Sequence, residues 1–210
     1  METWIGYFFH PEGRPVMSSR ERILAALDPG SPLRLPLPAG PRPALEDDPR
    51  QAFEQRTRAA EAEIISLPRL EAVPAWVRQR IPEGNVAVAP GLQDLDWSAF
   101  GEHAPFDGDT SCAVNLARCG IAETGTLALV SGPDTPTAFN FLPDQEIIVL
   151  EAGRIVPHLE DAWALLRQSD AFPPRALNLI AGPSRTADIE QTIQLGAHGP
   201  CSLVILIVGD

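Results

Sequence analysis

The chain of 210 residues contains no lysine, and all sixteen of its basic residues are arginine. Without lysine the chain cannot supply the phosphate-binding lysine of a P-loop, a Schiff base to pyridoxal phosphate or a lysine general base. Positive charge is scarce overall, because 28 acidic residues give a net charge of −12. Since nonspecific nucleic-acid binding depends on basic residues that release counterions from phosphate, we expect neither nucleic acid nor an anionic membrane as a partner.

Long apolar runs are missing as well. No run approaches the roughly 20 apolar residues that cross a bilayer. The apolar segment from Trp4 to Phe9 is short and lacks the preceding basic region of a secretory signal. We therefore expect a soluble protein located in the cytoplasm.

Cysteine is rare, with only Cys112, Cys119 and Cys201 in the chain. Three widely spaced thiols exclude a disulfide framework and a Cys-x-x-Cys metal clip, so we expect no metal site and three small buried side chains. The alternative is a zinc or iron–sulfur site that combines cysteines with His103 or His198, although the short ligand spacing of such sites is absent.

Proline is abundant, and it divides the chain. The prolines crowd into residues 28–49, which predicts an extended connector because neither a helix nor a central strand tolerates them. Residues 1–16 carry little pattern, which leaves open whether the protein starts at Met1 or Met17. We predict three parts: an extension over 1–16, a helical arm over 17–80 that includes the connector, and an α/β domain over 81–210.

Apolar periodicity predicts the elements of these parts. In the arm, helices are expected over residues 17–27 and 50–67 and from beyond Pro68 through Val77. Beyond the arm, strand and helix alternate and the strands are apolar throughout, which predicts a mostly parallel sheet with helices on both faces. The expected strands cover 85–90, 112–117, 126–131, 146–150, 176–181 and 202–208, with a short turn or helix over 136–142 and helices over 155–168 and 186–195.

One polar bend precedes an expected buried strand. Glu123, Thr124 and Gly125 place a carboxylate, a hydroxyl and a residue tolerant of positive φ just before Thr126, where the strand begins. Glu123 is the candidate catalytic residue, because a carboxylate held in such a bend can act as general base, metal ligand or nucleophile. The structural alternative is that Glu123 accepts hydrogen bonds from the backbone of its own turn.

A second bend, Gly182-Pro-Ser-Arg-Thr, stands between an expected strand and an expected helix. Backbone N–H groups at a helix start, the hydroxyls of Ser184 and Thr186 and the guanidinium of Arg185 can together bind an anion. Alternatively, Arg185 or Thr186 bonds to Glu123 across neighbouring strands. His198 can be a general acid or metal ligand, or a histidine with a structural partner only.

These segments together resemble the LUD-domain family, the lactate-utilisation proteins of the LutC kind. The resemblance lies in IAETGTL at 121–127, NFLP at 140–143, GPSRTADIE at 182–190 and HGP at 198–200, and it covers most of residues 85–210. It implies the fold version found in ribose-5-phosphate isomerases, CoA transferases and formyltetrahydrofolate cyclo-ligase. It also implies a role in an iron–sulfur-dependent system that oxidises L-lactate to pyruvate.

The chain itself shows no redox-cofactor motif. No Gly-x-Gly-x-x-Gly follows a strand and no four-cysteine run is present, so we expect no cofactor here. The resemblance then implies iron–sulfur clusters on partner subunits. One alternative is a stand-alone enzyme of the isomerase, CoA-transferase and cyclo-ligase type, acting on a small anionic metabolite with Glu123 as base or nucleophile; another is a pure interaction module.

The candidate residues are expected to share one crevice. In an open parallel sheet, right-handed crossovers bring the loops after the strands to one edge, where ligands bind. Arg185 is the expected anion contact, since its planar fork can hold a carboxylate by two hydrogen bonds. The residues expected to converge are Glu123, Thr124, Thr126, Ser184, Arg185 and His198.

Overall fold

The chain separates into two compact units, residues 1–41 and 42–210. The computed structural model describes residues 18–27, 42, 44–45, 48–82, 85–100, 110–169, 172–187, 193–195 and 199–209. In the first unit α1 (Ser19–Leu27) begins with a reciprocal cap: Ser18 Oγ accepts from Glu21 N at 3.2 Å, and the Glu21 carboxylate accepts from Ser18 N at 2.7 Å. The predicted extension and most of the predicted connector lie outside the described residues.

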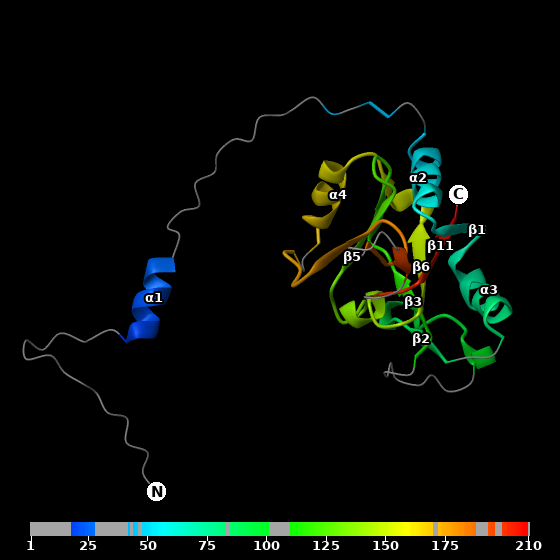
Figure 1. Ribbon diagram of the computed structural model, residues 1–210, viewed down its shortest axis with the longest axis horizontal. Helices are drawn as coiled ribbons and strands as arrows, with labels where there is room; N and C mark the ends of the chain where they lie inside the picture. The colour runs from blue at the N-terminus through cyan, green and yellow to red at the C-terminus, as the bar shows by residue number, and fades with distance from the viewer. Residues whose placement is uncertain are drawn as a thin grey trace, which may run out of the picture. The chain divides into compact units, whose positions relative to one another are not determined.

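Five parallel strands form the main sheet of the second unit (Figure 1). The central strands β11 and β6 pair along their whole length, with Ser202–Val208 opposite Gln145–Glu151. These findings confirm the mostly parallel α/β fold and the strands expected at both positions. In sheet order the strands are β1 (Glu63–Leu67), β11 (Ser202–Val208), β6 (Gln145–Glu151), β3 (Cys112–Leu116) and β2 (Val86–Val88).

Both faces of the main sheet are covered. Alternate residues of β6 face opposite ways, so Ile147 and Val149 join the cluster that contains Val77 of α3 (Val73–Arg80). Ile148 faces the other way and joins Phe53 of α2 (Pro49–Ala59) and residues of a second sheet. All five of these side chains are fully buried, as expected around parallel strands covered on two sides.

The second sheet is mostly antiparallel, which the sequence does not predict. The runs 126–131 and 176–181 are expected strands of the parallel sheet, but β5 (Thr126–Val130) pairs antiparallel with both β4 (Cys119–Ile121) and β8 (Leu177–Ile180). The reason is that only residues 122–125 separate β4 from β5, whereas a parallel connection needs a dozen residues or more. In sheet order the strands are β7 (Ile155–Val156), β4 (Cys119–Ile121), β5 (Thr126–Val130) and β8 (Leu177–Ile180), and α4 (Leu159–Leu166) packs on β4.

The helix predicted over residues 50–67 is wrong in its second half. It ends at Ala59, and residues 63–67 form β1 at the edge of the main sheet. Glu61 has a φ of 67°, a left-handed conformation that a right-handed helix cannot continue through. The branched side chains of Ile64 and Ile65 then favour a strand. Part of the predicted arm therefore lies within the α/β fold.

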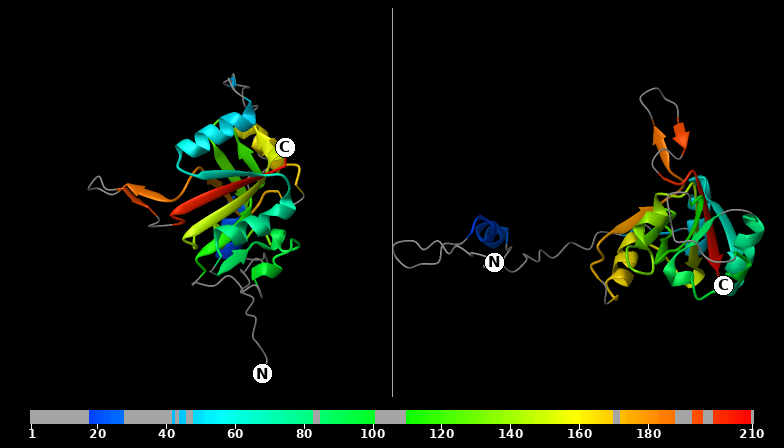
Figure 2. Two further views of the ribbon diagram at one scale, coloured as in Figure 1. Left: turned by 90° about the vertical axis from the view of Figure 1, so that its right-hand side faces the viewer. Right: turned by 90° about the horizontal axis from the view of Figure 1, so that it is seen from below.

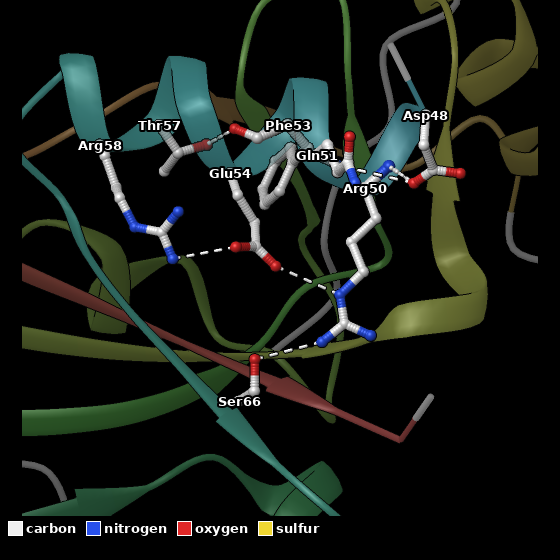
Figure 3. A network of polar contacts seen from close by, with 8 residues as sticks. All are labelled: Asp48, Arg50, Gln51, Phe53, Glu54, Thr57, Arg58 and Ser66. Carbon is white, nitrogen blue, oxygen red and sulfur yellow. Dashed lines mark hydrogen bonds and ion pairs between the residues drawn. The ribbon is translucent and has the colours of Figure 1, made fainter.

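A polar network joins α2 to β1 (Figure 3). The Asp48 carboxylate caps α2 by accepting from Arg50 N at 2.9 Å. Glu54 accepts from Arg50 at 3.2 Å and from Arg58 at 2.9 Å, one turn before and one turn after it. Arg50 also donates to Ser66 Oγ at 3.1 Å, which connects the helix to the strand.

The helix predicted over residues 186–195 is also wrong. Residues of that range lie in β9 (Arg185–Ala187) and β10 (Ile193–Leu195), which pair antiparallel and project from the two sheets (Figure 2). Ile193, Gln194 and Leu195 alternate between apolar and polar, which is the period of a strand.

The helix predicted over 155–168 begins only at Leu159, because residues 155–156 pair with β4 as β7.

Candidate functional site

The Glu123 bend is joined to the start of α4. Glu123 Oε2 lies 2.9 Å from His158 Nδ1, and Oε1 accepts a hydrogen bond from Leu159 N at 2.7 Å. The His158 hydrogen bond, with help from the Leu159 N–H, lowers the pKa of Glu123 against the opposing effect of partial burial. The partner of the carboxylate is thus another element rather than the turn's own backbone, and the geometry favours a structural fastening.

The rest of this bend packs on α2. Gly125 has a φ of 66°, and a Cβ there would lie 2.7 Å from Arg56 Cβ and 2.8 Å from Thr57 N. The buried Thr57 hydroxyl lies 3.1 Å from the carbonyl oxygen of Gly125, which accepts its hydrogen bond. Thr124 is exposed, and Thr126 is buried as the first residue of β5.

Arg185 interacts with the end of α2 and not with Glu123. Its guanidinium forms an ion pair with Glu61 and donates to Ala60 O at 3.3 Å. Since residues 185–187 form a strand, no helix begins within the described part of this bend, and the helix N-terminus invoked for the predicted anion site is not found there. The side chain of Thr186, and His198 altogether, lie outside what the structure describes.

Three of the four family segments meet at one cavity of about 210 Å³, which we call the Glu146 pocket. Ser184 N donates to Pro200 O at 2.8 Å, and a Cβ on Gly199 would lie 3.3 Å from Ser184 Cβ. Among the predicted site residues whose side chains are described, only Ser184 lines it. The lining also includes Asn140, Phe141, Glu146, Leu179, Gly182 and Leu203.

A buried polar cluster forms one wall of the Glu146 pocket. Asn115 Nδ2 donates to Asn140 Oδ1 at 2.5 Å, and the Asn115 side chain also hydrogen-bonds Glu146. Glu146 is 1% exposed, and its Oε1 has no hydrogen-bond partner among the described residues. Burial raises the pKa of Glu146 to about 8, partly offset by Asn115. None of these three residues is among the predicted site residues, although an acid and an amide inside apolar strands are visible signals in the sequence.

A second cavity, of about 250 Å³, lies where the rule for open α/β sheets places ligands. This carboxyl-edge cavity is lined by Arg118 after β3, Ser131 after β5, and Glu151 and Arg154 at the end of β6. Arg154 pairs with Glu151 at 3.1 Å. Among the described residues no hydrogen bond or ion pair engages the half-buried Arg118 guanidinium, which makes it a candidate contact for a ligand.

The described residues contain no evident centre for a metal. No three His, Cys, Asp or Glu side chains among them group closely enough to hold an ion. Burial raises the pKa of Cys112 to about 12 and that of Cys119 to about 11, so both behave as inert buried thiols. Cys201 is exposed, contrary to expectation.

No described helix combines the length and apolar character that a bilayer crossing requires.

Residues 109–208 match the family model of the LUD domain. This segment, about half of the chain, belongs to the LUD-domain family. It is 38% identical over 159 residues to an uncharacterized protein of Neisseria meningitidis serogroup B, covering 75% of this chain and 66% of that one. Against lactate utilization protein C it is 30% identical over 125 residues in Bacillus licheniformis (57% of this chain, 52% of that one) and 33% over 100 residues in Bacillus subtilis (46% and 42%).

This LUD-domain chain therefore spans about two thirds of the Neisseria protein and about half or less of these two Bacillus proteins. A crystal structure of a DUF162 family protein from Deinococcus radiodurans has the same fold. It superimposes with a TM-score of 0.59 at 18% identity and covers 80% of this chain and 100% of that one. The more specific likeness to isomerases and CoA transferases stays a prediction.

Proposed function

We propose that this LUD-domain protein is a LutC-like component of a cytoplasmic system that oxidises L-lactate to pyruvate. Its relatives named lactate utilization protein C support the lactate role. The sequence has neither a dinucleotide fingerprint nor a cysteine run for a cluster, so the electrons pass to iron–sulfur clusters on partner subunits.

The structural observation that supports this proposal is the Arg118 guanidinium, which lines the carboxyl-edge cavity and which no described residue engages. Lactate and pyruvate each present a carboxylate, which a planar guanidinium can hold by two charge-assisted hydrogen bonds. Arg154 is less free for this role because Glu151 already engages it. Ser131 Oγ accepts from Ala176 N at 2.7 Å and keeps its own proton for donation to a ligand oxygen. The carboxyl-edge cavity is thus the proposed site of the small acid.

Genetics and affinity capture test this function together. A strain that lacks the protein should lose growth on L-lactate as sole carbon source and keep growth on pyruvate. The wild-type chain should restore growth, and Arg118→Gln should restore it poorly. Affinity capture of the native protein should recover cysteine-rich iron–sulfur subunits; normal growth of the deletion strain together with capture of no such partner would contradict the proposal.

A second function rests on the Glu123–His158 pair. A carboxylate 2.9 Å from an imidazole at a bend is an arrangement used for proton transfer, which supports a stand-alone enzyme acting on a small anionic metabolite. In Glu123→Gln, lost turnover with an unchanged melting temperature would favour this enzyme. A lower melting temperature with turnover intact would favour the structural fastening to α4.

A further inference from the structure

The Glu146 pocket lies at the end of the main sheet away from the carboxyl-edge cavity. Glu146 and Leu203, which both line it, are the second residues of β6 and β11, so the pocket stands at the amino ends of these strands. The proposed lactate function uses the opposite end. The two proposed binding sites therefore lie at opposite ends of the sheet and share no lining residue.

Strand register places the polar groups of this pocket on one face. In the pairing of β3 with β6, Ala113 stands opposite Glu146 and Asn115 opposite Ile148. Asn115 and Glu146 are therefore diagonal neighbours with side chains on the same side of the sheet. Asn115 divides its hydrogen bonds among Asn140, Glu146 and the backbone N–H of Leu116, whose bond to Asn115 Oδ1 is 2.9 Å long.

This arrangement satisfies Asn115 and leaves Glu146 Oε1 without a partner among the described residues. A buried carboxyl oxygen without a hydrogen bond is destabilising, and a ligand that supplies the bond would remove that cost. No basic side chain is among the described residues that line the pocket, so none of them balances a negative charge. Because burial raises the pKa of Glu146 to about 8, the carboxyl is mostly protonated at neutral pH and can donate.

The remaining walls suit an apolar body. Leu203 and Ile180 line the pocket, and Ser184 adds a hydroxyl. Phe141 and Leu179 also line it, yet they are 45% and 48% exposed, which is unusual for large apolar side chains in the same small area. The pocket thus combines one buried polar end with an apolar mouth.

We propose that the Glu146 pocket binds a short acyl compound, whose carbonyl oxygen accepts a hydrogen bond from the Glu146 carboxyl and whose apolar chain contacts Phe141 and Leu179. An ammonium ligand would require Glu146 to ionise. A carboxylate ligand would bring an unbalanced negative charge into the pocket. A neutral carbonyl compound requires neither the ionisation of Glu146 nor the burial of a negative charge.

Three four-carbon probes of different charge test this proposal: 2-butanone, butyrate and butylamine. Titrations of the ¹⁵N-labelled full chain followed by NMR at pH 6.5 should show butanone shifting the amide signals of Gly182, Ser184 and Gly199. At pH 9.5 the butanone affinity should fall roughly thirtyfold, because about one carboxyl in thirty keeps its proton that far above a pKa of about 8. Absence of butanone binding, or tighter binding of butylamine or butyrate, would overturn the proposal.

Variants of Glu146 separate the effect of its proton on binding from the effect of its side-chain shape. Glu146→Gln keeps a donor that cannot titrate, so butanone should bind with similar affinity at both pH values. Glu146→Met removes the donor and should abolish binding. Glu71→Gln, which changes an exposed carboxylate on the chain, should leave the pH dependence as in the wild type.

Two further outcomes complete the test. If Glu146→Met does not fold, Glu146→Gln decides alone, because a pH dependence that persists in it would contradict donation by Glu146. Arg118→Gln should not change butanone binding. A failure of the lactate proposal at the carboxyl-edge cavity is thereby distinguishable from a failure at the Glu146 pocket.

Discussion

The two cavities at opposite ends of the main sheet hold ionisable groups in opposite states. At the carboxyl edge, the Arg118 guanidinium is half-buried and unpaired among the described residues, and it keeps its charge. At the amino ends, Glu146 is 1% exposed, and burial leaves its carboxyl mostly neutral near pH 7. The two proposals thus assign an anion to one end of the sheet and an uncharged oxygen to the other.

Burial, and not residue type alone, creates this difference. Arginine stays protonated in a protein, so its charged group has to lie where water or a ligand can contact it. A glutamate can avoid the cost of a buried charge by binding a proton. Substitutions at both ends of the sheet and at the Glu123 bend test this contrast between the two cavities.

The largest expected effect is on the pH dependence of stability at Glu146. The folded-state pKa of about 8 lies above the ordinary value of 4.5, so the folded chain binds more protons between these values. The contribution of Glu146 to the free energy of unfolding is therefore complete below pH 4.5 and is lost as pH rises to about 8. The loss is roughly 1.4 kcal/mol per pH unit and reaches roughly 5 kcal/mol. Urea denaturation from pH 4.5 to 9 should show this slope in the wild type and a flatter curve in Glu146→Gln; parallel curves would refute it.

Gly125→Ala should destabilise the fold without changing either cavity. Its φ of 66° and the 2.7 Å approach of an added Cβ to Arg56 Cβ predict a loss of about 2–4 kcal/mol in the free energy of unfolding. Gly132→Ala is the matched control, since no atom lies within 4 Å of a Cβ there. Equal melting temperatures for the two variants would show that the bend is not tightly packed on α2.

Arg118→Gln should act on ligand binding alone. Loss of a charge-assisted pair predicts a weaker pyruvate affinity by about 1.5–3 kcal/mol, with a change in stability within about 0.5 kcal/mol. Calorimetric titration with pyruvate measures the first quantity and thermal unfolding the second. Arg69→Gln, at an exposed arginine, serves as the control. Unchanged pyruvate binding in Arg118→Gln would remove the carboxyl-edge cavity from the proposal.

Glu123→Gln should have the smallest effect. The amide can still accept from Leu159 N but loses the charged partner of His158, so we expect a cost of about 1 kcal/mol or less at neutral pH. Because the pKa of Glu123 is lowered in the fold, its contribution is present above the ordinary value and is lost as pH falls through the folded value. Thermal unfolding should therefore show the two proteins converging in acid; a difference that persists there would contradict the assignment.

Local pattern was enough for the elements whose neighbours in sequence decide their form. The apolar run Ser202–Val208 is the strand β11 that it predicts, and the helix predicted over residues 17–27 is present as α1. The carboxylate-and-glycine bend before β5 is also present, with Gly125 at positive φ. These features depend on backbone propensity and hydrophobic periodicity, which act over a few residues.

Long-range packing settled the rest. Nothing in the apolar run of β5 distinguishes a parallel from an antiparallel neighbour, because a strand buried on both faces has the same composition in either sheet. Pairing of β5 with β4 and β8 takes the candidate residues to different places, Glu123 to α4 and Ser184 to the Glu146 pocket. The charge state of Glu146 likewise depends on the walls that exclude water from it, and those walls come from segments far apart in the chain.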